Sequence, residues 1–152
     1  LRAERERLAR DIDDHIDGHP ELKQDRDLLE SIPGVGPKVS VRLMATLRSR
    51  LFDSARQAAA FVGLVPVPHE SGSSVRGRPR LSKAGPPALR RRLYMAAVVS
   101  LRYNPDIAAQ YQRLTACGQP KMSALGAAMR KLVHIAFGVL KHQQPYQPQI
   151  AR

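Results

Sequence analysis

Apolar residues recur at helical spacing along most of the chain, which predicts an all-α fold. In residues 1–17, Leu8, Ile12 and Ile16 stand four positions apart among mixed charges, as in a narrow amphipathic helix. Residues 86–103 and 121–141 carry broader apolar faces, typical of helices that pack in a core. The expected core positions are Leu89, Leu93, Ala96, Ala97 and Ser100 in the first segment, and Met122, Leu125, Met129, Leu132, Val133, Ala136 and Leu140 in the second.

Cap and turn residues divide this helical pattern. Ser54 is placed to cap a short helix that Gly63 ends, and Asn104 followed by proline fits the start of another. Two prolines after Gly63 prevent the helix from continuing, so the chain is expected to run extended from there. It then enters one irregular Ser/Arg-rich loop at 69–85 before the next helix begins.

This pattern predicts three regions. Residues 1–20 are expected to be the end of a helix that pairs with another helix. Residues 21–142 are expected to form a compact helical domain, and the polar, proline-bearing residues 143–152 a disordered tail.

Charge is distributed unevenly along the chain. The net charge is +12, and residues 1–70 hold 11 Lys/Arg against 12 Asp/Glu, whereas residues 71–152 hold 14 Lys/Arg against one acid. A strong excess of positive charge in one half of the chain is typical of proteins that bind a phosphate backbone, and the affinity of such proteins falls steeply with salt.

The longest apolar run, at 93–101, is far short of the ~20 residues of a membrane helix. With the single Cys117, the sequence favours a cytoplasmic protein with no membrane partner.

One candidate phosphate site is the turn in "LLESIPGVGPKVSVRLMATL", residues 28–47, where a helix end meets Pro-Gly-Val-Gly and another helix begins near Pro37. The pattern resembles the helix-hairpin-helix motif. Gly34 and Gly36 permit backbone conformations closed to other residues. The amides of the turn can then face a phosphate, with Lys38 beside them, in a contact blind to base sequence. The alternative is a tight turn that only packs.

The second candidate is the stretch "HESGSSVRGRPRLSKAG", residues 69–85. A serine hydroxyl becomes a nucleophile with a base, a metal or a strongly stabilised transition state, and guanidinium groups stabilise phosphoryl transfer. Ser71 precedes a glycine, and His69 and Glu70 are neighbouring candidate proton acceptors. The candidate phosphate ligands are Ser73, Ser74, Arg76, Arg78, Arg80, Ser82, Lys83, Arg90, Arg91 and Arg92. The residues alone leave open both a catalytic serine and a plain phosphate-binding loop.

Three stretches together resemble the C-terminal half of a transposase family. They are "LLESIPGVGPKVS", "AAAFVGLVPVPHESGSSVRGRPRLSKAGPPALRRRLYMAA" and "GAAMRKLVHIAFGVLK". The family is the insertion-sequence-one-hundred-ten family, also known as the Piv-like or DEDD transposases. The resemblance covers about residues 28–141 in order. It implies that residues 1–20 are the end of the coiled-coil or linker helix that joins the two halves of such proteins.

The resemblance implies a catalytic-serine domain. The family's serine lies before a glycine after "GLVP", which matches Ser71, and it implies attack on a DNA phosphate and a phosphoserine intermediate. A RuvC-like domain that holds Mg²⁺ on four acids is implied as well, and this chain lacks it. The implied partners are DNA, a structured guide (bridge) RNA and further copies of the full-length protein in a dimer or tetramer.

No metal site or cofactor is expected within this chain. Four aspartates crowd one short helix, where a solvated acidic face is the simpler interpretation: Asp11, Asp13, Asp14 and Asp17. The chain alone is therefore expected to bind nucleic acid without recombining it. Aromatic residues are scarce, so backbone contacts to duplex DNA or structured RNA are expected to dominate.

Two other functions compete with the catalytic-serine domain. One is a non-catalytic helix-hairpin-helix module that binds nucleic acid, with "SGSSVRGR" as a phosphate clamp. The other is a structural, oligomerising domain whose positive charge only aids solubility.

Overall fold

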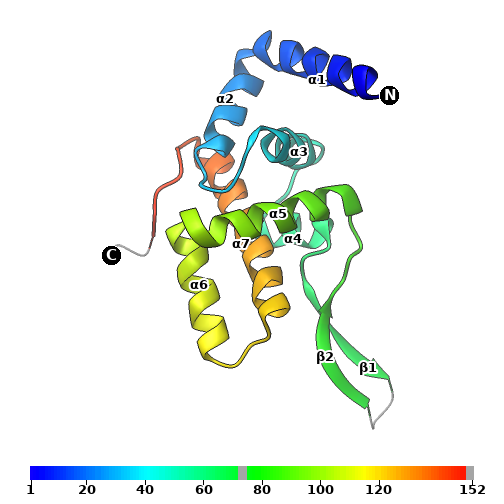
Figure 1. The fold of residues 1–152 in the computed structure, drawn as a ribbon, viewed down its shortest axis with the longest axis vertical. Helices are drawn as coiled ribbons and strands as arrows, with labels where there is room; N and C mark the ends of the chain where they lie inside the picture. The colour runs from blue at the N-terminus through cyan, green and yellow to red at the C-terminus, as the bar shows by residue number, and fades with distance from the viewer. Residues whose placement is uncertain (72–74, 150–152) are drawn as a thin grey trace.

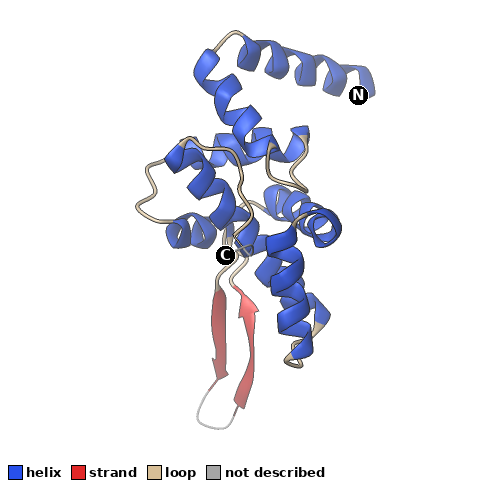
Figure 2. Cartoon of the chain, turned by 90° about the vertical axis from the view of Figure 1, so that its left-hand side faces the viewer, coloured by secondary structure: helices blue, strands red, loops and turns tan. Residues whose placement is uncertain are grey.

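The computed structural model describes residues 1–71 and 75–149, with backbone alone for 68–71 and 75–79. Most of the helices pack around α7, while α1 and a two-stranded hairpin project from opposite ends of the molecule (Figures 1 and 2). The described elements are α1 (Arg2–Asp17), α2 (Pro20–Glu30), α3 (Pro37–Arg48), α4 (Ala55–Val62), β1 (Pro66–Ser71), β2 (Val75–Leu81), α5 (Pro87–Tyr103), α6 (Pro105–Ala116) and α7 (Lys121–His142). The predicted all-α class is confirmed.

Several helix ends follow from local chemistry. Ser54 caps α4, and its side chain accepts the Gln57 amide at 3.2 Å. Gly63 ends the same helix with a left-handed φ of 82°. Asn104 caps α6 by accepting the Ile107 amide at 3.2 Å. These contacts satisfy backbone groups that a helix leaves unpaired at its ends.

The core is built around α7, which contacts every helix from α2 to α6. Leu132 and Val133 are fully buried and share one apolar cluster with Leu93 of α5 and Ile107 of α6. Among the described helices, only α7 is apolar and long enough to cross a membrane by length and composition, and half of that stretch is buried in the fold. Two expected core residues are not fully buried: Met122, in the first turn of α7, is exposed, and Leu140 is only partly buried.

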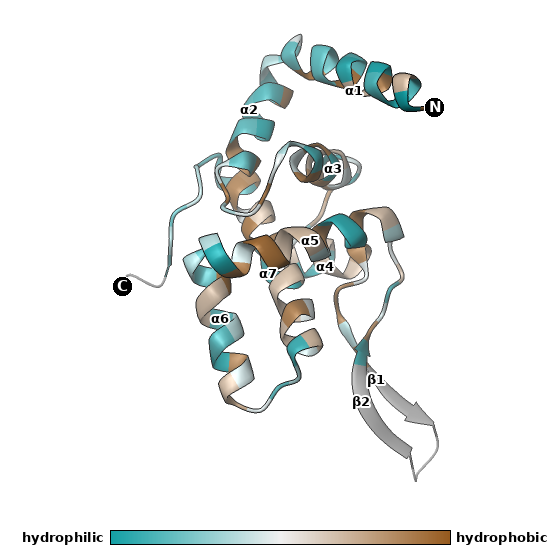
Figure 3. Cartoon of the chain, in the orientation of Figure 1, coloured by the Kyte–Doolittle hydropathy of each residue, from teal (hydrophilic) through white to brown (hydrophobic). Residues whose placement is uncertain are grey.

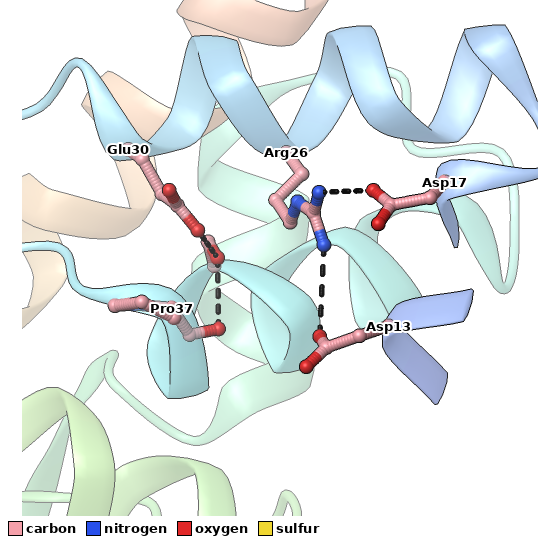
Figure 4. A network of polar contacts seen from close by, with 6 residues as sticks. Asp13, Asp17, Arg26, Glu30 and Pro37 are labelled. Atoms are coloured by element: carbon pink, nitrogen blue, oxygen red, sulfur yellow. Dashed lines mark hydrogen bonds and ion pairs between the residues drawn. The ribbon is translucent and has the colours of Figure 1, made fainter. Parts of the chain in front are cut away.

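Only the C-terminal end of α1 is attached to the rest of the molecule. Ile16 is buried, and Arg26 of α2 donates to Asp17 at 2.7 Å and lies 3.6 Å from Asp13 (Figure 4). Exposed ion pairs contribute about 0.2–1 kcal/mol, so the burial of Ile16 accounts for much of the attachment. The rest of α1 is mostly hydrophilic (Figure 3).

The segment predicted as an irregular loop contains an antiparallel β-hairpin. β1 and β2 pair from Pro66 opposite Leu81 to Ser71 opposite Val75, with one register shift. Prolines and a glycine within these strands weaken the strand signal in the sequence. The hairpin tolerates them because each strand of a two-stranded sheet has a free edge, where a missing N–H need not break the ladder.

Residues 143–149, within the segment expected to be a disordered tail, run back along the helical body. The Tyr146 hydroxyl donates to Asp106 at 2.5 Å and lies 3.0 Å from the side-chain oxygen of Asn104. Its amide donates to Ser31 Oγ at 2.9 Å, and the Gln149 amide reaches Asp106 at 3.0 Å. The tail thereby covers Asp106, which is only 5 % exposed.

Replacing Tyr146 by Phe is expected to lower the free energy of unfolding by about 1–3 kcal/mol at neutral pH, because the buried Asp106 carboxylate loses a donor. Urea unfolding of the wild type and the variant measures the difference. Tyr103→Phe, at an exposed tyrosine, is the matched control and should change little.

The difference in unfolding free energy between the wild type and Tyr146→Phe is expected to depend on pH. Burial, together with the hydrogen bond to Asp106, raises the pKa of Tyr146 above its ordinary value of 10.0. Above that value the unfolded chain loses the phenol proton while the folded chain keeps it, so unfolding becomes easier. The wild type should exceed Tyr146→Phe in free energy of unfolding by a constant amount below the ordinary tyrosine pKa, and this difference should decrease as the pH rises above that pKa. An advantage that stays constant at high pH would contradict the docked tail.

Candidate nucleic-acid interface

The turn between α2 and α3 is fixed against α5. The Pro33 carbonyl accepts hydrogen bonds from Ser100 Oγ and Asn104 Nδ2, each at 3.2 Å. Gly34 has a φ of 100°, and a Cβ added there would lie 1.9 Å from Ser100 Oγ. A larger residue would displace the turn from α5. Gly34 is therefore required by packing as well as by its backbone conformation.

Gly36 is under no such constraint. Its φ of −93° and ψ of 179° are open to other residues, and a Cβ added there would meet nothing within 4 Å. The backbone amides of Gly36 and Lys38 find no acceptor among the described residues, as is usual at a helix N-terminus. Lys38 is exposed at the same end of α3. The turn therefore offers open space next to two free backbone amides and a lysine, and an anionic group such as a phosphate could bind there.

Beside this turn, α3 and α5 border an open groove of about 590 Å³, which we term the α3–α5 groove. Three arginines line it, Arg42 from α3 and Arg91 and Arg92 from α5. Its other lining residues are Gly34, Val39, Ala88, Met95, Ala96 and Val99. Since no acid of the described chain lines this groove, its electrostatic potential is positive.

Arg42 is a groove residue that the sequence analysis missed. It lies four positions after Lys38, so both residues fall on one face of α3. That spacing was the available signal. It was overlooked because the sequence shows basic residues clustered in the 76–92 region, whereas Arg42 stands alone among apolar neighbours.

Arg90 lies apart from the two arginines that follow it. Its Nη1 donates to the Gly85 carbonyl at 2.5 Å and lies 3.4 Å from the Val62 carbonyl. Gly85 itself is pressed against α4, since a Cβ there would lie 2.1 Å from the Phe61 carbonyl oxygen. Arg90 therefore ties the segment that follows the hairpin to α4, and it does not line the α3–α5 groove.

Three predicted residues lie at the base of the hairpin. The Ser82 amide donates to the Val65 carbonyl and the Lys83 amide to the Gly63 carbonyl, each at 3.1 Å. Lys83 has a left-handed φ of 52° and an exposed side chain. Arg80 is exposed and pairs with Val67 across the ladder. These residues are exposed or half-buried cationic and polar groups on a rigid base.

Ser71 is the last residue of β1, at the end of the strand far from the helical body (Figures 1 and 2). Its neighbour Glu70 pairs with Arg76 in β2, which also contains Arg78. Ser73 and Ser74 lie outside the described residues. Apart from Arg90, Ser73 and Ser74, the predicted site residues thus fall into two groups, one at the α3–α5 groove with its turn and one at the hairpin with its base.

The acidic residues of the described chain do not assemble into a metal site, since no three His, Cys, Asp or Glu side chains there are grouped to hold an ion. Asp13 and Asp17, from the acidic helix, instead approach Arg26.

The fold and the site define an all-α domain in which an arginine-lined groove is joined to a projecting hairpin with a serine and several arginines. The chain belongs to the IS116/IS110/IS902 transposase family, whose model matches residues 26–112. This confirms the family resemblance.

Similar proteins extend the match over most of the chain. It is 33% identical over 133 residues to the pilin gene-inverting proteins of Moraxella bovis and Moraxella lacunata, which covers 86% of this chain and 41% of each relative. It is 26% identical over 145 residues to an uncharacterized 43.6 kDa protein of insertion element IS110 from Streptomyces coelicolor, covering 95% of this chain and 35% of that protein. The chain thus spans about two fifths of the length of the pilin gene-inverting relatives.

Proposed function

We propose that this chain is the serine-bearing, DNA-binding part of a transposase or site-specific recombinase. The observation that carries the proposal is the α3–α5 groove, with its three arginines, beside a turn with free amides. Asp106 is the one acid after residue 70 and does not line the groove, so basic residues dominate the charge of that half. Membership of a transposase family and likeness to gene-inverting proteins support DNA as the ligand.

In this proposal Ser71 supplies the nucleophile. Its Oγ bonds to a DNA phosphorus while one P–O ester bond of the strand breaks, which leaves the strand end as a phosphoserine ester. The hydroxyl proton passes to a base, for which His69 and Glu70 are the neighbouring candidates, and the departing oxygen takes up a proton. Arg76 and Arg78 of the paired strand would stabilise the negative charge that builds on the phosphate.

The reaction requires more than this chain. We propose that Mg²⁺ is held by a RuvC-like domain of the parent protein, and that a structured guide RNA and further copies of that protein, in a dimer or tetramer, are its partners. The hairpin projects from the body (Figure 1), which supports a site completed by another domain or subunit. A cytoplasmic location is part of the same proposal.

A second candidate is a non-catalytic helix-hairpin-helix module. The open space over Gly36 favours it, because the fold itself does not require a glycine there. In that case the turn would bind phosphates and the hairpin would serve only as a clamp.

Binding to the groove is expected to depend on salt. The double variant Arg91→Gln, Arg92→Gln should weaken binding of duplex DNA and reduce the slope of log affinity against log salt by about 1 for each lost phosphate contact. Fluorescence anisotropy across a salt series measures both quantities. Arg56→Gln with Arg113→Gln, at exposed positions outside the groove, is the matched control. Equal losses in both double variants, or a flat salt profile, would favour a structural domain whose charge only aids solubility.

Ser71→Ala in the full-length parent protein should abolish strand cleavage and leave DNA binding unchanged, because the nucleophile is lost while the cationic surface remains. A DNA cleavage assay and denaturing gels that detect a covalent protein–DNA adduct measure this. Ser123→Ala, at an exposed serine of α7 outside the predicted site, is the control and should retain cleavage. Unaltered recombination by Ser71→Ala would leave only the binding module, and loss of cleavage in Ser73→Ala or Ser74→Ala alone would move the nucleophile to that residue.

A further inference from the structure

The lining of the α3–α5 groove includes exposed or half-buried apolar residues as well as arginines, and we term Met95, Val99 and Val39 its floor. Met95 and Val99 of α5 keep 59% and 44% of their surface exposed there, and Val39 of α3 lines the same groove. A duplex presents phosphates and sugars outward and keeps its base faces stacked inside. It would therefore pair with the arginines and leave the floor in water. Exposed apolar residues gathered within a charged rim are typical of a surface that a ligand covers.

An unpaired nucleotide matches both parts of this surface. Its base has two apolar faces that can pack on Met95 and Val99, and the methionine thioether makes favourable contacts with aromatic rings. The phosphates on either side can reach Arg42, Arg91 and Arg92 through charge-assisted hydrogen bonds. The groove volume of about 590 Å³ lies within the usual range of small-ligand sites.

The lining also distinguishes DNA from RNA. Apart from its arginines, the groove is lined only by glycine, alanine, valine and methionine, so the thioether of Met95, a weak acceptor, is the one side chain of this lining that could accept a hydrogen bond from a ribose 2′-OH. A 2′-OH placed on this floor would exchange water for at most this weak partner, which costs free energy. The CH₂ group of deoxyribose carries no such cost.

We propose that the α3–α5 groove holds an unpaired nucleotide of single-stranded DNA, with its base on Met95 and Val99 and its flanking phosphates on the three arginines. The inference rests on the proposed function in one respect, that the chain binds DNA. It adds that part of the bound DNA is single-stranded at this groove.

The test uses the 152-residue chain with three fluorescent probes: oligodeoxythymidylate, oligouridylate of the same length, and a blunt duplex. Met95→Gln and Val99→Thr keep the size of the side chain and make the floor polar. Each should weaken oligodeoxythymidylate binding about ten-fold and leave the duplex affinity within about two-fold. The wild type should bind oligodeoxythymidylate more tightly than oligouridylate. Met122→Gln, at a methionine that is 65% exposed on α7, is the control and should change neither affinity.

Each other outcome has a definite meaning. Unchanged oligodeoxythymidylate binding in both floor variants, equal losses for the duplex, or equal affinity for the two single strands would overturn this inference and leave the proposed function intact. A wild type that binds none of the probes would overturn both. The rival occupant is the acidic helix α1 of a second copy, whose Leu8 and Ile12 are exposed. A dimer seen by sedimentation in the wild type and lost in Met95→Gln would assign the groove to that helix and overturn the DNA site.

Discussion

The Pro33 carbonyl holds the two sides of the interface together. It accepts hydrogen bonds from Ser100 and Asn104, whose side chains are almost fully buried. A buried polar group without a partner costs about 1–3 kcal/mol, so this turn must sit against α5 for the fold to be stable. Gly34 makes the contact possible, because any Cβ at that position would collide with Ser100. The contact fixes α3 beside α5, and the groove between them follows from it.

Helix α5 therefore serves three purposes along its length. Near its start, Arg90 ties the end of the hairpin to α4. In its middle, Arg91, Arg92 and Met95 line the α3–α5 groove, and near its end Ser100 holds the turn. A straight helix keeps these three regions at fixed distances from each other. A DNA strand in the groove would thus have a defined position relative to the base of the hairpin, whose first strand ends at Ser71.

The helices could be predicted from the sequence because each is specified locally. Apolar periodicity places α5 and α7 in the core, and Ser54 and Asn104 cap their helices through contacts with residues three positions away. The hairpin could not be predicted in the same way, since its prolines and glycine oppose strand formation and only the pairing of the two strands stabilises it. The docked tail was missed for a related reason, because Tyr146 depends on Asp106, which is forty residues earlier.

Most residues of the candidate site could be named from the sequence, but their positions relative to one another could not. Arg90, Arg91 and Arg92 are consecutive in the sequence, yet successive helical residues point about 100° apart. As a result Arg90 contacts backbone carbonyls and the other two arginines line the groove. Arg42 lies in the same groove because the Pro33 contact brings α3 alongside α5. No single segment of the sequence contains that information.

Both candidate functions share the proposal that the turn between α2 and α3 contacts the DNA backbone, and Gly36→Ala tests it most directly. An added Cβ meets nothing within 4 Å in the protein, so the free energy of unfolding should change by no more than about 0.5 kcal/mol. The same methyl group would occupy part of the open space in which we propose that a DNA phosphate approaches the turn, so affinity for duplex DNA should fall about ten-fold, as expected when one charge-assisted hydrogen bond is lost. Unchanged stability together with unchanged DNA affinity would contradict the account and reduce the turn to a packing element.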